Sequence, residues 1–190
     1  MYCETPEEID KAFWLLPPRP VVLVSTIDKK GNQNVAPHCE FIKLYEGPFL
    51  IAIEKSHDTF KNILETKEFV VSIPTIDIAK KIAITGKPFP KGVSEFEKAG
   101  LTPLKASKVK APLVKECCAN FECKLIKELG SVGTESILVG EILCTHYKKV
   151  GPSEEETRLS TKAALHVHKG RIYTTINKET IDTKIDYTKL

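Results

Sequence analysis

An apolar, β-branched run that leads directly into a polar turn is the feature that most limits the possible folds of this chain. Residues 21–27, VVLVSTI, are almost continuously apolar, which indicates a strand buried on both faces. Residues 28–32, DKKGN, have the composition of a turn between antiparallel strands. Residues 34–44 can return as a second strand, so the simplest interpretation of this stretch is a β-hairpin.

Further strands recur along the chain, and only short helices separate them. Apolar or alternating patterns predict strands at residues 48–53, 69–73, 119–128, 136–148, 165–168 and 171–175. Helical spacing of apolar residues predicts helices at 59–66 and 76–85. A capping-box pattern, Thr5 followed by Glu8, predicts a helix at 5–14, and one further short helix is expected at 94–99. Ser56, Asp58 and Thr59 are all candidates for the N-cap of the helix at 59–66. A polar turn is expected at residues 130–133, between the two longest strands.

This order of elements predicts a mainly β (α+β) protein, a closed or nearly closed antiparallel barrel with short peripheral helices. Closure would hide the unpaired edges of the sheet. The βαβα alternation of a doubly wound fold is absent, and so are the G-x-G-x-x-G and Walker motifs. Any bound nucleotide would therefore have to be held without either motif. The chain of 190 residues is long enough to bury a core as a single domain, residues 1–190.

Composition and charge exclude several classes of protein. The net charge of +3 is spread along the sequence, which argues against a nucleic-acid partner. Residues 1–16 carry acids where a signal peptide would carry bases, and no apolar run approaches the ~20 residues of a membrane span. We therefore expect a cytoplasmic protein with no membrane partner. Its six cysteines should be reduced thiols, with Cys117, Cys118 and Cys123 acting as small hydrophobic residues, and no metal site is expected.

A candidate phosphate site lies where the strand at 48–53 meets the following helix. Residues Lys55, Ser56, His57 and Thr59 combine cations and hydroxyls with the free N–H groups of a helix start, all of which a terminal phosphate attracts. Asp58 suits a capping role better than a phosphate contact because its carboxylate repels phosphate. An ordinary helix N-cap beside a solvated lysine explains the same pattern.

A second candidate group surrounds the first hairpin. Small residues in this strand pair would allow a flat ring to approach the backbone closely, and hydroxyl and amide groups could bind its polar edge. The candidates are Ser25, Thr26, Asn34, Val35, Ala36, Pro37, His38 and Cys39. A plain hairpin with a polar turn is the alternative. Near the end of the chain, His166 and His168 share one side of a strand, but no third metal ligand is obvious in the sequence.

These segments, in this order and spacing, resemble the flavin reductase-like family of FMN-binding split barrels, which includes flavoredoxins and archaeal ferric reductases. The resemblance implies a split-barrel fold with FMN as cofactor. It assigns Lys55, Ser56, His57 and Thr59 to the FMN phosphate, the 34–39 segment to the flavin ring, and His166 to the flavin or its nicotinamide partner. His38 and Cys39 depart from the usual N-x-A-P-x-S pattern of the family, and this departure could alter redox behaviour or the choice of acceptor.

The run from Phe89 to Leu101, FPKGVSEFEKAGL, resembles a family loop that packs over the partner subunit's flavin in a homodimer. Lys91 is the candidate contact to the partner's phosphate or nicotinamide. The alternative is an amphipathic helix that buries Val93, Phe96 and Leu101 in its own subunit.

The resemblance implies hydride transfer from NAD(P)H to FMN, with electrons passed to a ferric chelate or a redox protein. This chemistry requires no acid–base catalytic residue. An electron carrier without NAD(P)H activity and a non-enzymatic binding barrel are the other possibilities.

Overall fold

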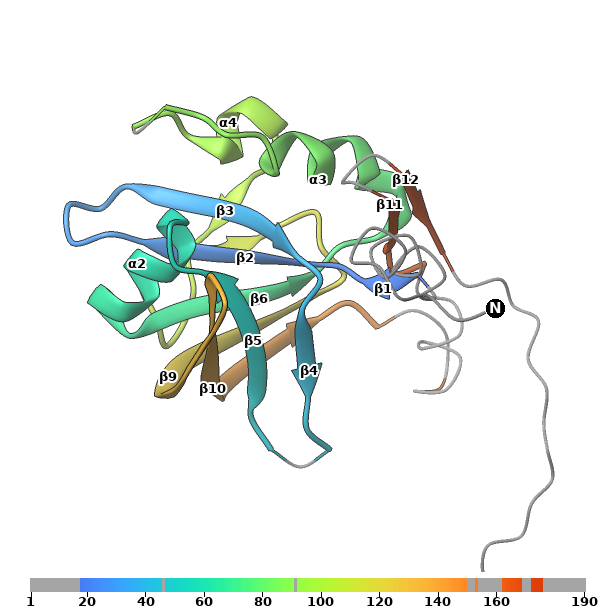
Figure 1. Ribbon diagram of the computed structural model, residues 1–190. Coiled ribbons are helices and arrows are strands. Elements are labelled where there is room, and N and C mark those ends of the chain that lie inside the picture. The colour runs from blue at the N-terminus through green and yellow to red at the C-terminus, as the bar shows by residue number, and fades with distance from the viewer. Residues whose placement is uncertain are drawn as a thin grey trace, which may run out of the picture.

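Most of the chain is organised around one antiparallel sheet of seven strands (Figure 1). The computed structural model describes residues 18–45, 47–90, 92–149, 153, 162–168 and 172–175. The predicted helix at 5–14 lies outside these residues. In spatial order the strands are β3 (Gln33–His38), β2 (Val22–Ile27), β6 (Glu68–Ile73), β9 (Ala119–Val132), β10 (Glu135–Tyr147), β5 (Phe49–Glu54) and β4 (Phe41–Lys43).

The two edge strands of this sheet are consecutive in the chain, and this forces the sheet to curl. Only Cys39 and Glu40 separate β3 from β4, although β3 pairs with β2 and β4 pairs with β5 at the opposite edge. The predicted single strand at 34–44 is therefore wrong, because the chain leaves one edge and joins the other at this point. The result is the predicted barrel. Strand pairing continues around it from β3 to β4, and the barrel is split between these two edge strands.

The barrel interior and an outer layer hold separate apolar clusters. Val22 and Val24 of β2 point inward and pack with Phe69 and with Ile63 of helix α2 (Asp58–Thr66). Leu23, on the other face of β2, packs under two further helices, α3 (Ala79–Thr85) and α4 (Glu95–Ala99). This two-sided burial confirms the prediction made from the continuous apolar run.

The three predicted helices that lie within the described residues occur where predicted, but two details differ. His57 occupies the N-cap position of α2, and none of the three predicted candidates does. The expected helix at 76–85 begins as a 3₁₀ turn, η2 (Ile76–Ile78), before α3. Ser94 caps α4 by accepting a hydrogen bond from the Glu97 N–H at 3.3 Å. In the described ranges, no helix combines the length and apolar character needed to cross a membrane.

Of the two long strands, β9 extends further than predicted, whereas β10 has the predicted length and begins one residue earlier. Pairing between β9 and β10 continues through Gly130 and Ser131 to Val132, so the predicted turn at 130–133 shrinks to Gly133 and Thr134. Three register irregularities allow this long ribbon to bend. A two-stranded sheet, β7 (Pro103–Leu104) and β8 (Leu113–Val114), was not predicted.

The predicted C-terminal hairpin is confirmed. Strands β11 (Leu165–His168) and β12 (Ile172–Thr174) pair with each other, and β1 (Arg19–Pro20) pairs with β11.

The predicted apolar role of two cysteines is also confirmed, because Cys117 and Cys123 are buried in apolar clusters. Burial raises the pKa of the Cys123 thiol to about 12.

Candidate functional site

The edge strand β3 faces the beginning of helix α2, and this brings the two predicted groups of site residues together. Strand alternation places Asn34, Ala36 and His38 on one face of β3. The Asn34 side-chain amide donates a hydrogen bond to Thr59 Oγ1 at 3.0 Å. The rings of His38 and His57 lie 6.4 Å apart. Two segments more than twenty residues apart in sequence therefore form one site.

The first turn of α2 offers backbone donors toward this site. The N-cap residue His57 has extended backbone angles, and its side chain makes no capping hydrogen bond. The first N–H groups of a helix have no partner within the helix, and the helix dipole adds partial positive charge there. Thr59 is only 1% exposed, so its hydroxyl is fixed beside these donors. This arrangement suits an anion such as a terminal phosphate.

The other predicted phosphate ligands contact different partners in this structure. Ser56 Oγ donates to Glu54 Oε1 at 2.6 Å, and His57 Nε2 lies 3.4 Å from Glu54 Oε2. Lys55 Nζ donates to Ser131 Oγ at 3.2 Å. The side chains of residues 55–57 are exposed, and exposed ion pairs and hydrogen bonds of this kind contribute little free energy. A bound phosphate dianion could therefore compete for them.

Ser25 and Thr26 point to opposite sides of β2 because they are neighbours in one strand. The fully buried Ser25 hydroxyl donates to the Pro112 carbonyl, away from α2. Thr26 Oγ1 accepts a hydrogen bond of 3.0 Å from Asn62 Nδ2, on α2. The Thr26 side chain thus positions Asn62, whereas the Ser25 side chain stabilises the fold by binding the Pro112 carbonyl.

His38 is the most deeply buried polar group on the site face of β3. Its side chain is 7% exposed, and the described part of the chain offers its Nε2 atom no hydrogen-bond partner. Burial, with a smaller effect from the charge of His57, lowers the pKa of His38 to about 4. The ring is therefore neutral at pH 7, and one of its nitrogen atoms still has capacity for a ligand hydrogen bond.

Most of the remaining predicted residues in and after β3 pack against other parts of the chain, and one of them faces the candidate site. Val35 is fully buried in the outer apolar cluster. Pro37 packs so closely on Gly86 that a Cβ atom at Gly86 would lie 3.1 Å from the proline ring. Cys39 lies beside the same cluster, and burial raises the pKa of its thiol to about 11, so it is protonated at neutral pH. Only Ala36 combines small size with a place on the site face.

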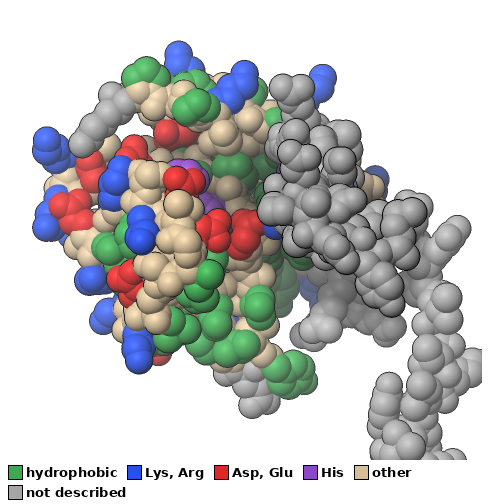
Figure 2. Space-filling model, in the orientation of Figure 1, with side chains coloured by type: hydrophobic (Ala, Val, Ile, Leu, Met, Phe, Trp, Pro, Cys, Tyr) green, Lys and Arg blue, Asp and Glu red, His purple; other side chains and the backbone are tan. Residues whose placement is uncertain are grey.

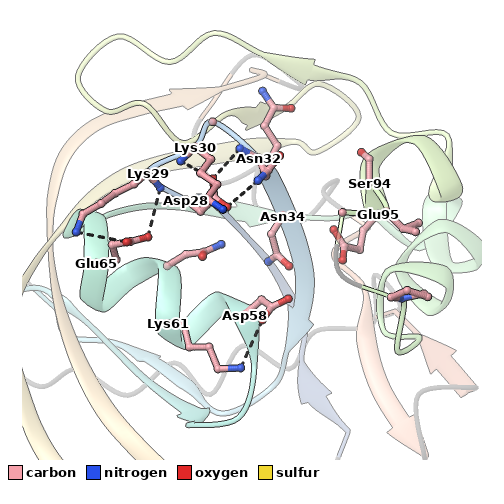
Figure 3. Close-up of a pocket in the computed structure, with 16 residues that line it drawn as sticks. Asp28, Lys29, Lys30, Asn32, Asn34, Asp58, Lys61, Glu65, Ser94 and Glu95 are labelled. Atoms are coloured by element: carbon pink, nitrogen blue, oxygen red, sulfur yellow. Dashed lines mark hydrogen bonds and ion pairs between the residues drawn. The ribbon is translucent and has the colours of Figure 1, made fainter.

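A polar pocket of about 810 Å³ opens between the β2–β3 turn, α2 and the segment before α4 (Figure 3). Asn34 and Asp58 lie on one side of it, and Ser94 and Glu95 lie opposite. The pocket is also lined by Asp28, Lys29, Lys30, Gly31, Asn32, Gln33, Lys61, Asn62, Glu65, Pro90, Gly92 and Val93. This volume is in the range of small-molecule and cofactor sites.

The charged groups around the pocket partly neutralise one another. Lys61 Nζ lies 3.5 Å from Asp58, and Lys29 Nζ lies 3.3 Å from Glu65. The pKa of Glu95 is raised, chiefly by burial and also by the nearby charge of Asp58. Two acids on facing walls make this part of the site better suited to hydroxyl and amide groups than to a phosphate.

Among the described residues that line this pocket, sequence reasoning predicted Asn34 as a ligand contact and missed the others, Asn62 and Glu95 among them. The signal for Asn62 was available, because it lies three residues after Thr59 and so on the same face of α2. No local pattern distinguishes Glu95 from other acids at a helix start. The segment around Phe96 and Leu101 packs into its own subunit, where both side chains are nearly fully buried.

Two predicted site residues remain, Lys91 and His166. Lys91 lies outside the described residues. His166, on β11, has its ring centroid 5.8 Å from that of Tyr173, in the small sheet with β1. The predicted role of His166 toward the flavin or the nicotinamide stays a prediction. The side chain of His168 is also outside the described part.

Comparison with known proteins assigns the chain to a family. The model of the flavin reductase like domain matches residues 16–174, so this protein belongs to the flavin reductase-like family. An uncharacterised protein of Aquifex aeolicus is 40% identical over 157 residues, which cover 73% of this chain and 80% of that protein. Membership of the family implies a flavin as the cofactor.

Solved structures share the fold. A candidate flavin reductase with a split barrel domain from Shewanella frigidimarina aligns with a TM-score of 0.80 at 22% identity, over 97% of this chain and 94% of that one. The flavoredoxin of Desulfovibrio vulgaris (Miyazaki F) aligns with a TM-score of 0.76 at 20% identity, over 91% and 94%. The fold is thus the split barrel that the sequence predicted.

The residues present fit a flavin. The unpartnered Nε2 atom of the buried His38 and the uncapped N–H groups of α2 are polar groups that a ligand with a polar ring and a phosphate would satisfy. Ala36, between Asn34 and His38, leaves room for a flat ring against the strand.

Proposed function

We propose that this protein is an NAD(P)H-dependent flavin oxidoreductase that uses FMN and passes electrons to an acceptor such as a ferric chelate or a redox protein. The observation that carries the proposal is the meeting of the β3 face with the start of α2, seen in the Asn34–Thr59 hydrogen bond. One side of this junction suits a flat ring with a polar edge, and the other suits a phosphate. FMN has both parts.

Each residue of the junction has a proposed task. Thr59, the N–H groups of the first α2 turn and the exposed Lys55, Ser56 and His57 would hold the phosphate. Asn34 and Ala36 would position the ring, with Thr26 acting through Asn62 at the side of the pocket. His38 is neutral at pH 7 and offers the ring a hydrogen bond without a full charge.

When bound, the flavin supplies the two-electron chemistry, since it can take a hydride from a nicotinamide and deliver electrons onward. The chain's own contribution is positioning and exclusion of water. Buried Thr59 and His38 are fixed by packing, which keeps their polar atoms in place before the ligand arrives. The polar pocket beside them, lined by Asn32, Ser94 and Glu95, provides hydroxyl- and amide-binding groups for the nicotinamide substrate.

We also propose that the protein works as a homodimer. Exposed apolar side chains gather on the lower part of the face shown in Figure 2, over β4 and β5. Ile42, within β4, is 61% exposed, and Tyr45, two residues after β4 ends, is 97% exposed. On β9, Ile126 and Leu129 are 59% and 53% exposed. A second copy would cover apolar surface that water otherwise contacts.

The visible spectrum of the purified protein tests the proposal. The protein should bind FMN and show an absorption band near ~450 nm, which should bleach anaerobically when NADH or NADPH is added. A flavin that persists on addition of either nucleotide would identify an electron carrier that needs a protein donor. No fluorescence change on titration with micromolar FMN would overturn the proposal and favour a non-enzymatic binding barrel.

A further inference from the structure

A second group of polar side chains lies on β9 and β10 and shares no residue with the flavin site. Glu122 on β9 is directly opposite Cys144 on β10 in the strand register, and His146 follows two residues later on β10. The ligand atoms of these three side chains, a carboxylate oxygen, a thiol sulfur and an imidazole nitrogen, all lie within 4.8 Å of one another. Their chemical types are those that bind Zn²⁺ in proteins.

The carboxylate of this group is rigidly held. Glu122 is fully buried, and its two oxygens accept hydrogen bonds from the N–H groups of Ser107, Lys108 and Val109 at 2.5–3.0 Å. These hydrogen bonds fix the position of the carboxylate, as outer hydrogen bonds fix a metal ligand.

One of the distances between these ligand atoms already matches tetrahedral coordination, and a second requires a small movement. Cys144 Sγ and His146 Nε2 are 3.6 Å apart. Bond lengths of about 2.3 Å to sulfur and about 2.0 Å to nitrogen place these two atoms about 3.6 Å apart around a tetrahedral Zn²⁺. His146 Nε2 and Glu122 Oε1 are 2.6 Å apart and would need to separate to about 3.4 Å. His146 can make this movement, because 35% of its side chain is exposed.

We propose that Glu122, Cys144 and His146 form a binding site for Zn²⁺ that is independent of the flavin. Cys144 and His146 reach the ion from the same side of β10, as residues separated by one position do. Three protein ligands leave one position for solvent. Because Glu122 also holds residues 107–109, the bound ion ties that loop to β9 and β10.

The competing explanation is a structural hydrogen bond between His146 and Glu122 with Cys144 as a bystander. The two explanations differ in the thiol, which is a direct metal ligand in the first and makes only a weak 3.6 Å contact with His146 Nε2 in the second. They also differ in their response to His146→Gln. A glutamine amide can still donate a hydrogen bond to Glu122, but it is a poor replacement for imidazole as a zinc ligand.

The test is a titration of chelator-treated protein with Co²⁺, which occupies zinc sites and has a visible spectrum. Difference spectra remove the absorption of any flavin. We expect one Co²⁺ per chain, a thiolate-to-cobalt charge-transfer band in the near ultraviolet, and loss of the spectrum when Zn²⁺ displaces the cobalt. Cys144→Ser should abolish the near-ultraviolet band, and His146→Gln should weaken binding by about tenfold or more.

The matched control is Cys118→Ser, which removes another half-buried thiol, one that donates to the Ile73 carbonyl at 3.2 Å. This variant should keep the cobalt spectrum. Circular dichroism and melting curves of each variant verify folding. The proposal is overturned if the wild-type chain gives no charge-transfer band in large Co²⁺ excess, if the band survives Cys144→Ser, or if His146→Gln binds Co²⁺ like the wild type. The wild-type titration decides the matter even if a variant does not fold.

Discussion

The side-chain amide of Asn34 donates a hydrogen bond to Thr59 Oγ1 over 3.0 Å, and this contact joins an edge strand of the barrel to the first turn of α2. Neither residue is unusual in its own segment. Their juxtaposition depends on the hairpin that returns β3 along β2 and on the packing of α2 against the barrel interior. The most direct predictions concern this contact.

Thr59→Ala should weaken FMN binding about ten- to hundredfold, because a hydrogen bond to a charged group contributes about 1.5–3 kcal/mol. Thr59→Ser should retain most of the affinity, since it keeps the hydroxyl. Thr66→Ala is the control, with the same change at the far end of α2, where the hydroxyl donates to the Asn62 carbonyl at 2.8 Å. Fluorescence titration of FMN measures all three. Equal affinities for Thr59→Ala and Thr66→Ala would contradict the proposed phosphate site.

Ser25→Ala should lower the free energy of unfolding by about 1–3 kcal/mol and leave FMN affinity nearly unchanged. The Ser25 hydroxyl donates to the buried Pro112 carbonyl, which would lose its partner. Denaturant unfolding and FMN titration of the same preparation separate the two effects. A large loss of affinity with little loss of stability would show that Ser25 contacts the flavin, as the sequence suggested.

The stability of the protein should fall as the pH drops from about 6.5 toward 4. The folded state holds the pKa of His38 at about 4, below the ordinary value of 6.5, because the ring is buried and lies near His57. In that pH window the unfolded chain binds the proton more readily, so unfolding becomes easier. The full effect is about 3 kcal/mol at pH values below both pKa values.

His38→Gln tests this pH effect, because glutamine is polar but does not titrate. Urea unfolding at pH 7.5 and at pH 5 should show a smaller loss of stability in the variant than in the wild type. Equal losses in both proteins would mean that other groups cause the acid sensitivity and that His38 is not held neutral by the fold.

Gly140→Ala should destabilise the barrel by about 1–3 kcal/mol through overpacking. A Cβ atom at Gly140 would lie 2.3 Å from Cζ of the fully buried Phe69. Phe69→Leu in the same chain should restore part of the loss, because it shortens the side chain that clashes. Melting temperatures of the two single variants and the double variant measure this coupling, and simple additivity of their effects would rule out the clash.

Ile42→Asp should shift the protein toward the monomer in sedimentation velocity. It places a charge in the exposed apolar surface on β4, where we propose the second copy binds. Leu104→Asp is the matched control, because Leu104 is also an exposed apolar residue, 42% accessible, but lies on β7 of another sheet. Dissociation by both substitutions, or by neither, would argue against an interface centred on β4.

Local patterns determined the kinds of elements in this protein and most of their places. The apolar run at 21–27 required a strand with two covered faces, and the residues after it required a turn, because such preferences act between near neighbours. The same applies to α2 and to the C-terminal hairpin. The first hairpin, the strand-to-helix junction at 55–59 and the 89–101 run were also sufficient to indicate the family.

Only the tertiary structure decided where the candidate side chains point and which partners they contact. Ser25 and Thr26 look equivalent in sequence, yet strand alternation sends one to Pro112 and the other to Asn62. Glu122 and Cys144 are twenty-two residues apart, and only strand register places them opposite each other. Such relationships depend on long-range pairing, which one-dimensional patterns do not encode. The break of residues 34–44 into β3 and β4 has the same cause, since it is closure of the barrel that moves the chain from one edge of the sheet to the other.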